Sequence, residues 1–132
     1  MRLLHTMLRV AHLEKSLNFY TEMLGMQELR RIDNKDYQYT LSFIGYSDEA
    51  HHTVLELTHN WGEHTYELGT SYGHIAIECE DIYAVCKKIQ LSGFVVSREP
   101  GPVLGGTVEI AFVKDPDGYS IELIQKTNTQ KF

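Results

Sequence analysis

Polar and apolar residues follow the same order twice along the chain. In residues 3–10 polar and apolar side chains alternate, which is typical of a half-buried strand. Residues 13–24 instead repeat apolar side chains at helical spacing, and Gly25 ends that helix. Three further strands are predicted over residues 26–32, 37–46 and 53–59, separated by turn-forming segments.

The pattern starts again after a polar connector, residues 60–72. A strand is predicted over residues 73–79, followed by a helix over residues 82–91 with Asp81 as its N-cap. Strands are then predicted over residues 94–98, 107–114 and 119–125, the last two joined by the turn sequence DPDG. We expect the polar end, residues 127–132, to be frayed.

The order strand, helix and three strands therefore occurs twice. It predicts an α+β fold built from tandem βαβββ modules, over about residues 3–59 and 73–125, within a single domain spanning residues 1–132. A period this long, found only twice, does not fit a solenoid. Two such modules are expected to set their sheets side by side and to form a sheet-lined cleft.

Composition and charge narrow the classes of function. The 132 residues are 42% hydrophobic, as in an ordinary globular domain. A net charge of -6 and the lack of a basic patch argue against nucleic acid or a membrane as partners, and no stretch approaches a membrane span. Cys79 and Cys86 lie in a strand running into a helix, which gives a disulfide little room, so reduced thiols and a cytoplasmic location are expected.

Each module carries one histidine in its first strand and one glutamate in its last. Glu56 follows His5 by 51 residues, and Glu122 follows His74 by 48. Each glutamate lies between apolar neighbours, where an unpaired carboxylate is costly and a cation relieves the cost. Taken singly, each residue fits a structural role. Taken together, two imidazoles and two carboxylates at equivalent positions of a repeat favour a divalent metal site.

Three polar residues are candidates for binding a substrate. Arg9 follows His5 by four residues and Asn60 follows Glu56 by four, so continued strands would turn both side chains to the metal face. A cation and an amide there fit a ligand that bears carboxylates. Arg98, in the segment SREPGPVLGG, is a further candidate for the same task. The remaining histidines are assigned no metal role: His12, His51, His52, His59 and His64.

Six segments, in order, carry a resemblance to a known family: HTMLRV, SLNFYTEMLGM, VLELTHNWG, YELGTSYGHIAI, GPVLGGT and AFVKDPDGYSIELI. The sequence resembles glyoxalase I, or lactoylglutathione lyase, in its short bacterial form, a member of the vicinal-oxygen-chelate superfamily. The resemblance covers nearly the whole chain. Each segment is a moderate signal alone, whereas their order and spacing together are specific.

The resemblance implies paired βαβββ modules and a homodimer whose active sites lie between subunits. It implies an octahedral metal with two waters and four protein ligands, matched here by His5, Glu56, His74 and Glu122. A histidine as the first ligand resembles the nickel- or cobalt-activated subclass. The expected cofactor is therefore Ni²⁺, with Co²⁺ or Mn²⁺ as alternatives and Zn²⁺ disfavoured. Whether the modules pair within a chain or across chains stays open.

The resemblance also implies an activity: isomerisation of the hemithioacetal of methylglyoxal and glutathione to S-lactoylglutathione, which detoxifies methylglyoxal. Glu122 matches the residue that shuttles the proton, and Glu56 is the second, pseudo-symmetric carboxylate. The expected substrate-binding residues are Arg9, Asn60, His74 and Arg98, of which Arg9 and Asn60 match glutathione-binding residues.

Two other functions are open to the same fold. A ring-cleaving dioxygenase uses a two-histidine, one-carboxylate iron site with open positions for oxygen, and Glu56 as a fourth ligand argues against it. A non-catalytic module, such as a drug-sequestering dimer, has no need of four metal ligands. Metal binding by chelator-treated protein separates that module from the enzyme.

Overall fold

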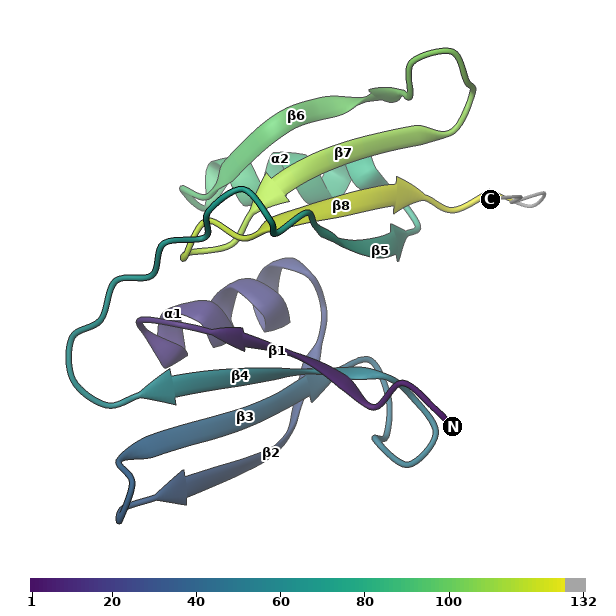
Figure 1. Ribbon diagram of the computed structural model, residues 1–132. Helices are drawn as coiled ribbons and strands as arrows, with labels where there is room; N and C mark the ends of the chain where they lie inside the picture. Colours follow the sequence, from purple (N-terminus) through teal and green to yellow (C-terminus); the bar gives the residue numbers. More distant parts are fainter. Residues whose placement is uncertain (128–132) are drawn as a thin grey trace. The chain divides into compact units, whose positions relative to one another are not determined.

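The computed structural model describes residues 1–127. The chain forms two compact units, the first over Met1–Glu67 and the second beginning at Leu68. Each unit is a four-stranded mixed sheet with a helix on one face (Figure 1). Both units are βαβββ modules, which confirms the predicted fold class.

The first unit follows the order β1 (His5–Arg9), α1 (Leu13–Asn18), a π-helical turn η1 (Phe19–Met23), β2 (Gln27–Asn34), β3 (Tyr39–Gly45) and β4 (Val54–Asn60). Its sheet has the order β1-β4-β3-β2, in which only β1 and β4 are parallel. The predicted helix is present, and its last turn is π-helical. There the Thr21 hydroxyl donates to the carbonyl of Leu17 at 2.7 Å.

The second unit repeats this topology with β5 (Ile75–Cys79), α2 (Ile82–Leu91), β6 (Val95–Pro102), β7 (Glu109–Lys114) and β8 (Ser120–Gln125). Its sheet has the order β5-β8-β7-β6, and β5 is parallel to β8. Asp81 caps α2 as predicted, because its carboxylate accepts the backbone N–H groups of Tyr83 and Ala84 at 3.1 Å. Cys79 and Cys86 are both free thiols.

One strand boundary was wrong by four residues. The sequence predicts that the strand containing Arg98 ends there, whereas β6 continues to Pro102. Proline cannot donate to a sheet, but β6 pairs only with β7, and an edge strand leaves one side without partners. The other boundaries shift less: β1 begins at His5 rather than residue 3, and β5 begins at Ile75, directly after His74.

The pairing of first and last strands positions the site. Leu8 lies opposite Leu57 in the parallel pair β1 and β4, and both are buried. Since side chains alternate between faces, His5 and Glu56 are left on the opposite face of the sheet. None of the helices within residues 1–127 is long and apolar enough to cross a membrane. The expected fraying of residues 127–132 falls almost entirely on residues outside the described ones.

Candidate metal and substrate site

The first half of the candidate site, as the sequence predicts it, is the pair His5 and Glu56. Met7 lies directly opposite Glu56 in the parallel register, so His5 stands two positions earlier on the same face. The His5 Nε2 atom lies 3.4 Å from the Glu56 Oε2 atom. The glutamate side chain is 15% exposed and the imidazole 38% exposed. A partly buried carboxylate is thus aimed at an accessible imidazole.

The second half is the pair His74 and Glu122, built in the same way. Ala76 lies opposite Glu122, so His74 again stands two positions before the residue that faces the carboxylate. The His74 Nε2 atom lies 3.6 Å from the Glu122 Oε1 atom, with side-chain exposures of 44% and 16%. The equivalence predicted from the sequence therefore extends to register, distance and burial.

A phenylalanine completes each half. Phe43 on β3 lies directly opposite Glu56, and Phe112 on β7 lies directly opposite Glu122. Each ring meets the histidine of its unit edge-on, with ring centroids 5.7 Å and 5.3 Å apart. Sequence reasoning missed this pair. A search for a third residue type repeated between the modules would have found it.

The segment before each histidine is tied to the start of the last strand of its unit, at Thr53 directly before β4 and at Ser120 in β8. The Thr53 hydroxyl donates to the carbonyl of Leu3 at 2.7 Å, and the Tyr72 hydroxyl donates to the carbonyl of Ser120 at 2.9 Å. Burial, followed by the negative charge of Asp115, raises the pKa of Tyr72 to about 12. Tyr72 therefore stays a neutral donor at neutral pH and holds the chain two residues before the histidine.

An arginine on the neighbouring edge strand lies opposite each phenylalanine: Arg30 on β2 opposite Phe43, and Arg98 on β6 opposite Phe112. The Arg30 guanidinium carbon lies 3.6 Å from the centre of the Phe43 ring. Its nitrogens donate to the Glu49 carboxylate at 2.6 Å and 3.2 Å, and these bonds raise the pKa of Arg30. This guanidinium thus supports the ring that faces Glu56.

Arg98, opposite Phe112, uses its guanidinium differently. Its nitrogens donate to the carbonyls of Gly101, Ile110 and Pro102, at distances of 2.7–2.9 Å. These bonds hold together the end of the β6 and β7 ribbon. Its expected contact with a substrate stays a prediction.

Arg9 and Asn60 lie on the elements that carry the first half-site. Arg9 is the last residue of β1 and faces Thr58, and Asn60 is the last residue of β4 and faces Tyr39. Alternation along the strands places both on the face of His5 and Glu56, as the sequence predicts. The face therefore combines two metal-type donors with a cation and an amide.

The donors of the two pairs suit a divalent transition metal. Imidazole nitrogen and carboxylate oxygen are accepted by nickel, cobalt, manganese and zinc. The separations of 3.4 Å and 3.6 Å exceed a good N–H···O hydrogen bond of about 2.7–3.2 Å, and they are within the span of two ligands held about 2.0–2.2 Å from one cation. Within residues 1–127, no group of three or more potential ligands gathers. The union of the two pairs in one site stays a prediction.

Comparison with known proteins agrees with the fold. The family model described as the Glyoxalase/Bleomycin resistance protein/Dioxygenase superfamily matches residues 2–123. The repeated βαβββ unit is therefore the module of that superfamily.

Full-length relatives define the family within it. The chain is 63% identical over 124 residues to a probable lactoylglutathione lyase of Vibrio parahaemolyticus, covering 94% of this chain and 90% of the relative. It is 56% identical over 126 residues to the lactoylglutathione lyase of Escherichia coli O157:H7, covering 96% and 93%. The chain belongs to the lactoylglutathione lyase, or glyoxalase I, family of this superfamily.

Solved structures agree with this family. The crystal structure of glyoxalase I from Zea mays matches with a TM-score of 0.92 and 44% identity, covering 97% of this chain but 46% of the maize chain. This chain thus spans less than half the length of the maize protein. The trypanothione-dependent glyoxalase I of Leishmania major matches with a TM-score of 0.86 and 45% identity, covering 95% and 86%.

Proposed function

We propose that this chain isomerises the hemithioacetal of methylglyoxal and glutathione to S-lactoylglutathione, and so detoxifies methylglyoxal. The observation that carries the proposal is the duplicated His–Glu pair, with the same register offset in both units. The support from relatives is the identity of 56–63% to bacterial lactoylglutathione lyases over more than nine-tenths of the chain.

A divalent metal is proposed to be held by His5, Glu56, His74 and Glu122. When bound, it supplies positive charge that stabilises negative charge developing on the substrate oxygens. We propose Ni²⁺, with Co²⁺ or Mn²⁺ as alternatives, because a histidine as first ligand, His5, resembles the nickel- or cobalt-activated subclass, and imidazole and carboxylate donors suit these ions.

The proton transfer is assigned to Glu122. The reaction must move a proton from the carbon that bears sulfur to its neighbour, and a carboxylate can remove that proton and return it one carbon along. Glu56 is the pseudo-symmetric second carboxylate and would act on the opposite epimer of the hemithioacetal. Both side chains are about 15% exposed, so little bulk water competes with a bound substrate for their oxygens.

Recognition of glutathione is assigned to Arg9 and Asn60, with His74 and Arg98 as further contacts. A guanidinium recognises a carboxylate through charge-assisted hydrogen bonds, and glutathione has two carboxylates. The support is the position of Arg9 and Asn60 at the ends of the adjacent strands β1 and β4, on the face of the first half-site.

The proposed assembly is a cytoplasmic homodimer with active sites shared between subunits. The support is the resemblance to glyoxalase I, which places each site between subunits, since the two ligand pairs of one chain could meet within that chain or across two chains. The acidic net charge argues against nucleic acid and membrane as partners. The free Cys79 and Cys86 thiols fit a reducing compartment.

One experiment tests the function. Protein is stripped of metal with a chelator, each divalent ion is added in turn, and thioester formation from methylglyoxal and glutathione is followed. We expect activity that is absent in the stripped protein and returns with metal. A protein that binds metal without using Glu56 and forms no thioester with any ion would favour a dioxygenase, and a protein that binds no metal would favour a binding module.

A further inference from the structure

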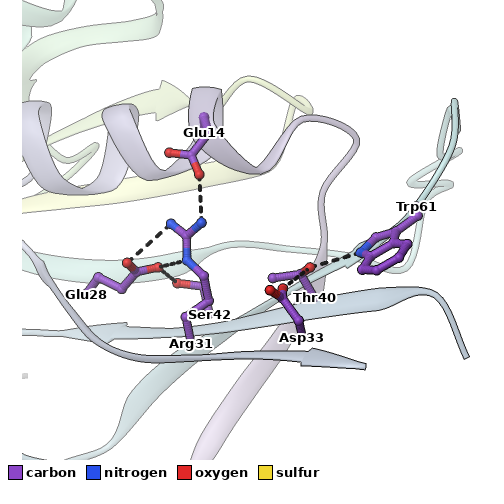
Figure 2. A network of polar contacts seen from close by, with 7 residues as sticks. All are labelled: Glu14, Glu28, Arg31, Asp33, Thr40, Ser42 and Trp61. Atoms are coloured by element: carbon purple, nitrogen blue, oxygen red, sulfur yellow. Dashed lines mark hydrogen bonds and ion pairs between the residues drawn. The ribbon is translucent and has the colours of Figure 1, made fainter. Parts of the chain in front are cut away.

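Trp61, which directly follows Asn60, donates one hydrogen bond to the turn before β3 and another to β3 itself. Its backbone N–H donates to the carbonyl of Gln38 at 2.9 Å. Its indole Nε1–H donates to the Thr40 hydroxyl at 2.9 Å, and that hydroxyl donates to the Asp33 carboxylate at 2.7 Å (Figure 2). The end of β4 is thereby tied across β3 to β2.

The direction of this relay is fixed by its chemistry. An indole N–H can only donate and an ionised carboxylate can only accept, so the Thr40 hydroxyl must accept from Trp61 and donate to Asp33. Thr40 is 6% exposed, which removes water as a ready substitute partner. Loss of any member therefore leaves its neighbour without its partner in the relay.

The turn that receives the backbone of Trp61 has an unusual conformation. Among residues 1–127, Gln38 is the one non-glycine residue with a positive φ, at 55°. Side chains rarely adopt this left-handed region, and such residues persist where the surrounding structure holds them. The backbone N–H of Trp61 donates to the carbonyl of Gln38 and so helps to hold this turn.

The tie approaches the strand end from the face away from the site. Asn60 lies opposite Tyr39, whereas Thr40 lies opposite His59. By alternation Asn60 is on the face of Glu56, and Thr40 is on the other face. The relay can therefore fix the backbone of Asn60 while leaving its amide on the substrate face.

We propose that Trp61 is a positioning residue for substrate binding, which sets the amide of Asn60 through the relay of Thr40 and Asp33. The inference rests on the proposed function, in which Asn60 binds the glutathione part of the substrate. Since that part is remote from the reacting carbons, a strand end that is free to move weakens binding and leaves the chemical step intact.

The test uses the metal-loaded enzyme with the glutathione hemithioacetal of methylglyoxal. Trp61→Phe removes the indole N–H, and we expect KM to rise about threefold to tenfold with kcat within about twofold of the wild type. Thr40→Val should also raise KM, whereas Thr40→Ser keeps the hydroxyl and should have a KM close to that of the wild type. The matched control is Tyr83→Phe in the second unit. It removes a hydrogen bond of 2.6 Å from an aromatic side chain, the Tyr83 hydroxyl, to the Glu109 carboxylate, and it should leave KM and kcat unchanged.

A double-mutant cycle separates positioning from general stability. In an Asn60→Ala background, Trp61→Phe should raise KM no further, because the group that it positions is gone. Equal increases in both backgrounds, or an unchanged KM in Trp61→Phe and Thr40→Val, would overturn the inference. A wild-type enzyme that forms no thioester would instead overturn the proposed function, so the two failures are distinguishable.

Discussion

Phe43 and Phe112 occupy equivalent positions in the two units: each ring lies directly opposite a glutamate and meets a histidine edge-on. An aromatic ring offers a carboxylate no strong hydrogen-bond donor. The rings therefore flank the two carboxylates with apolar surface, and in the first unit the Arg30 guanidinium lies over the Phe43 ring and adds positive charge that interacts with Glu56. The two units therefore match in the side chains around each glutamate as well as in strand order. This match favours a cation bound by the histidine and glutamate pairs.

Nickel or cobalt is expected to activate the stripped protein far more than zinc. The reason is His5 as the first ligand in a set of two nitrogens and two carboxylates, which suits octahedral ions, while zinc often prefers fewer ligands. Initial rates at equal metal occupancy provide the measurement. Full activity with zinc together with none with nickel would contradict the assignment.

Activity is expected to depend on a homodimer. Each unit brings one histidine and one glutamate together, and the resemblance to glyoxalase I places the union of two such pairs between subunits. Sedimentation velocity at assay concentration, combined with rates measured on dilution, checks this. An active monomer would show that the two pairs meet within one chain.

Arg9→Ala is expected to lower kcat/KM by roughly tenfold to a hundredfold. A charge-assisted hydrogen bond contributes about 1.5–3 kcal/mol, and the proposed partner of Arg9, a carboxylate of glutathione, is remote from the reacting carbons. The loss should therefore appear mainly in KM. Unchanged kinetics with the glutathione adduct would return Arg9 to the role of a surface residue.

Glu122→Gln is expected to lose at least the general-base factor, about 10²- to 10⁴-fold in rate. The substitution keeps the shape and one oxygen donor but removes the charge and most of the basicity. It should also bind metal less tightly, so the rate must be measured with occupancy verified.

Glu56→Gln is the matched control for that substitution, because it makes the same change at the equivalent place on β4. With both variants loaded with metal, Glu122→Gln should be the more impaired toward the productive adduct. Near-normal turnover of Glu122→Gln would leave it as a ligand only, and the proton shuttle would then be sought at Glu56.

The stability of the first unit is expected to fall in acid through Glu28. Burial raises the pKa of this carboxyl, but hydrogen bonds from Ser42 and Arg31 and the charge of Arg31 outweigh burial, so the pKa lies below its ordinary value of 4.5 (Figure 2). The stabilisation is therefore fully present above pH 4.5 and is lost as the pH falls through the lower, folded-state pKa.

Chemical unfolding of Glu28→Gln across this range provides the check. The variant should be less stable than the wild type by on the order of 1 kcal/mol at pH 7, and the difference should shrink in acid. Glu14→Gln is the control, because its side chain is 77% exposed and water screens its pairing with Arg31. A difference that grows as the pH falls would contradict the assignment.

The module order could be predicted because each element follows local rules. Alternation marks the strands, and Asp81 marks the start of α2 by supplying a side-chain acceptor. The ligand pairs could be predicted because a repeat makes equivalent positions visible. His5 and Glu56 are adjacent because parallel pairing joins the first and last strands.

Features set by pairing between strands could not be predicted in this way. The end of β6 depends on its position at the sheet edge, and the relay from Trp61 to Asp33 depends on which residues of three strands lie side by side. The carbonyl contacts of Arg98 depend on how the β6 and β7 ribbon closes. Such relations follow from register, which the alternation of a single strand does not specify.

The parallel pairing of β1 with β4 also bears on how the protein folds. His5 and Glu56 are separated by almost the whole module, so they meet only through a contact of high sequence separation. Closing so long a segment costs chain entropy before any contact returns it, whereas the hairpin of β2 and β3 closes locally. Uptake of the proposed metal during refolding would therefore lag behind formation of the hairpin, because it must wait for the N-terminal strand to dock and for the second pair of ligands to join the first.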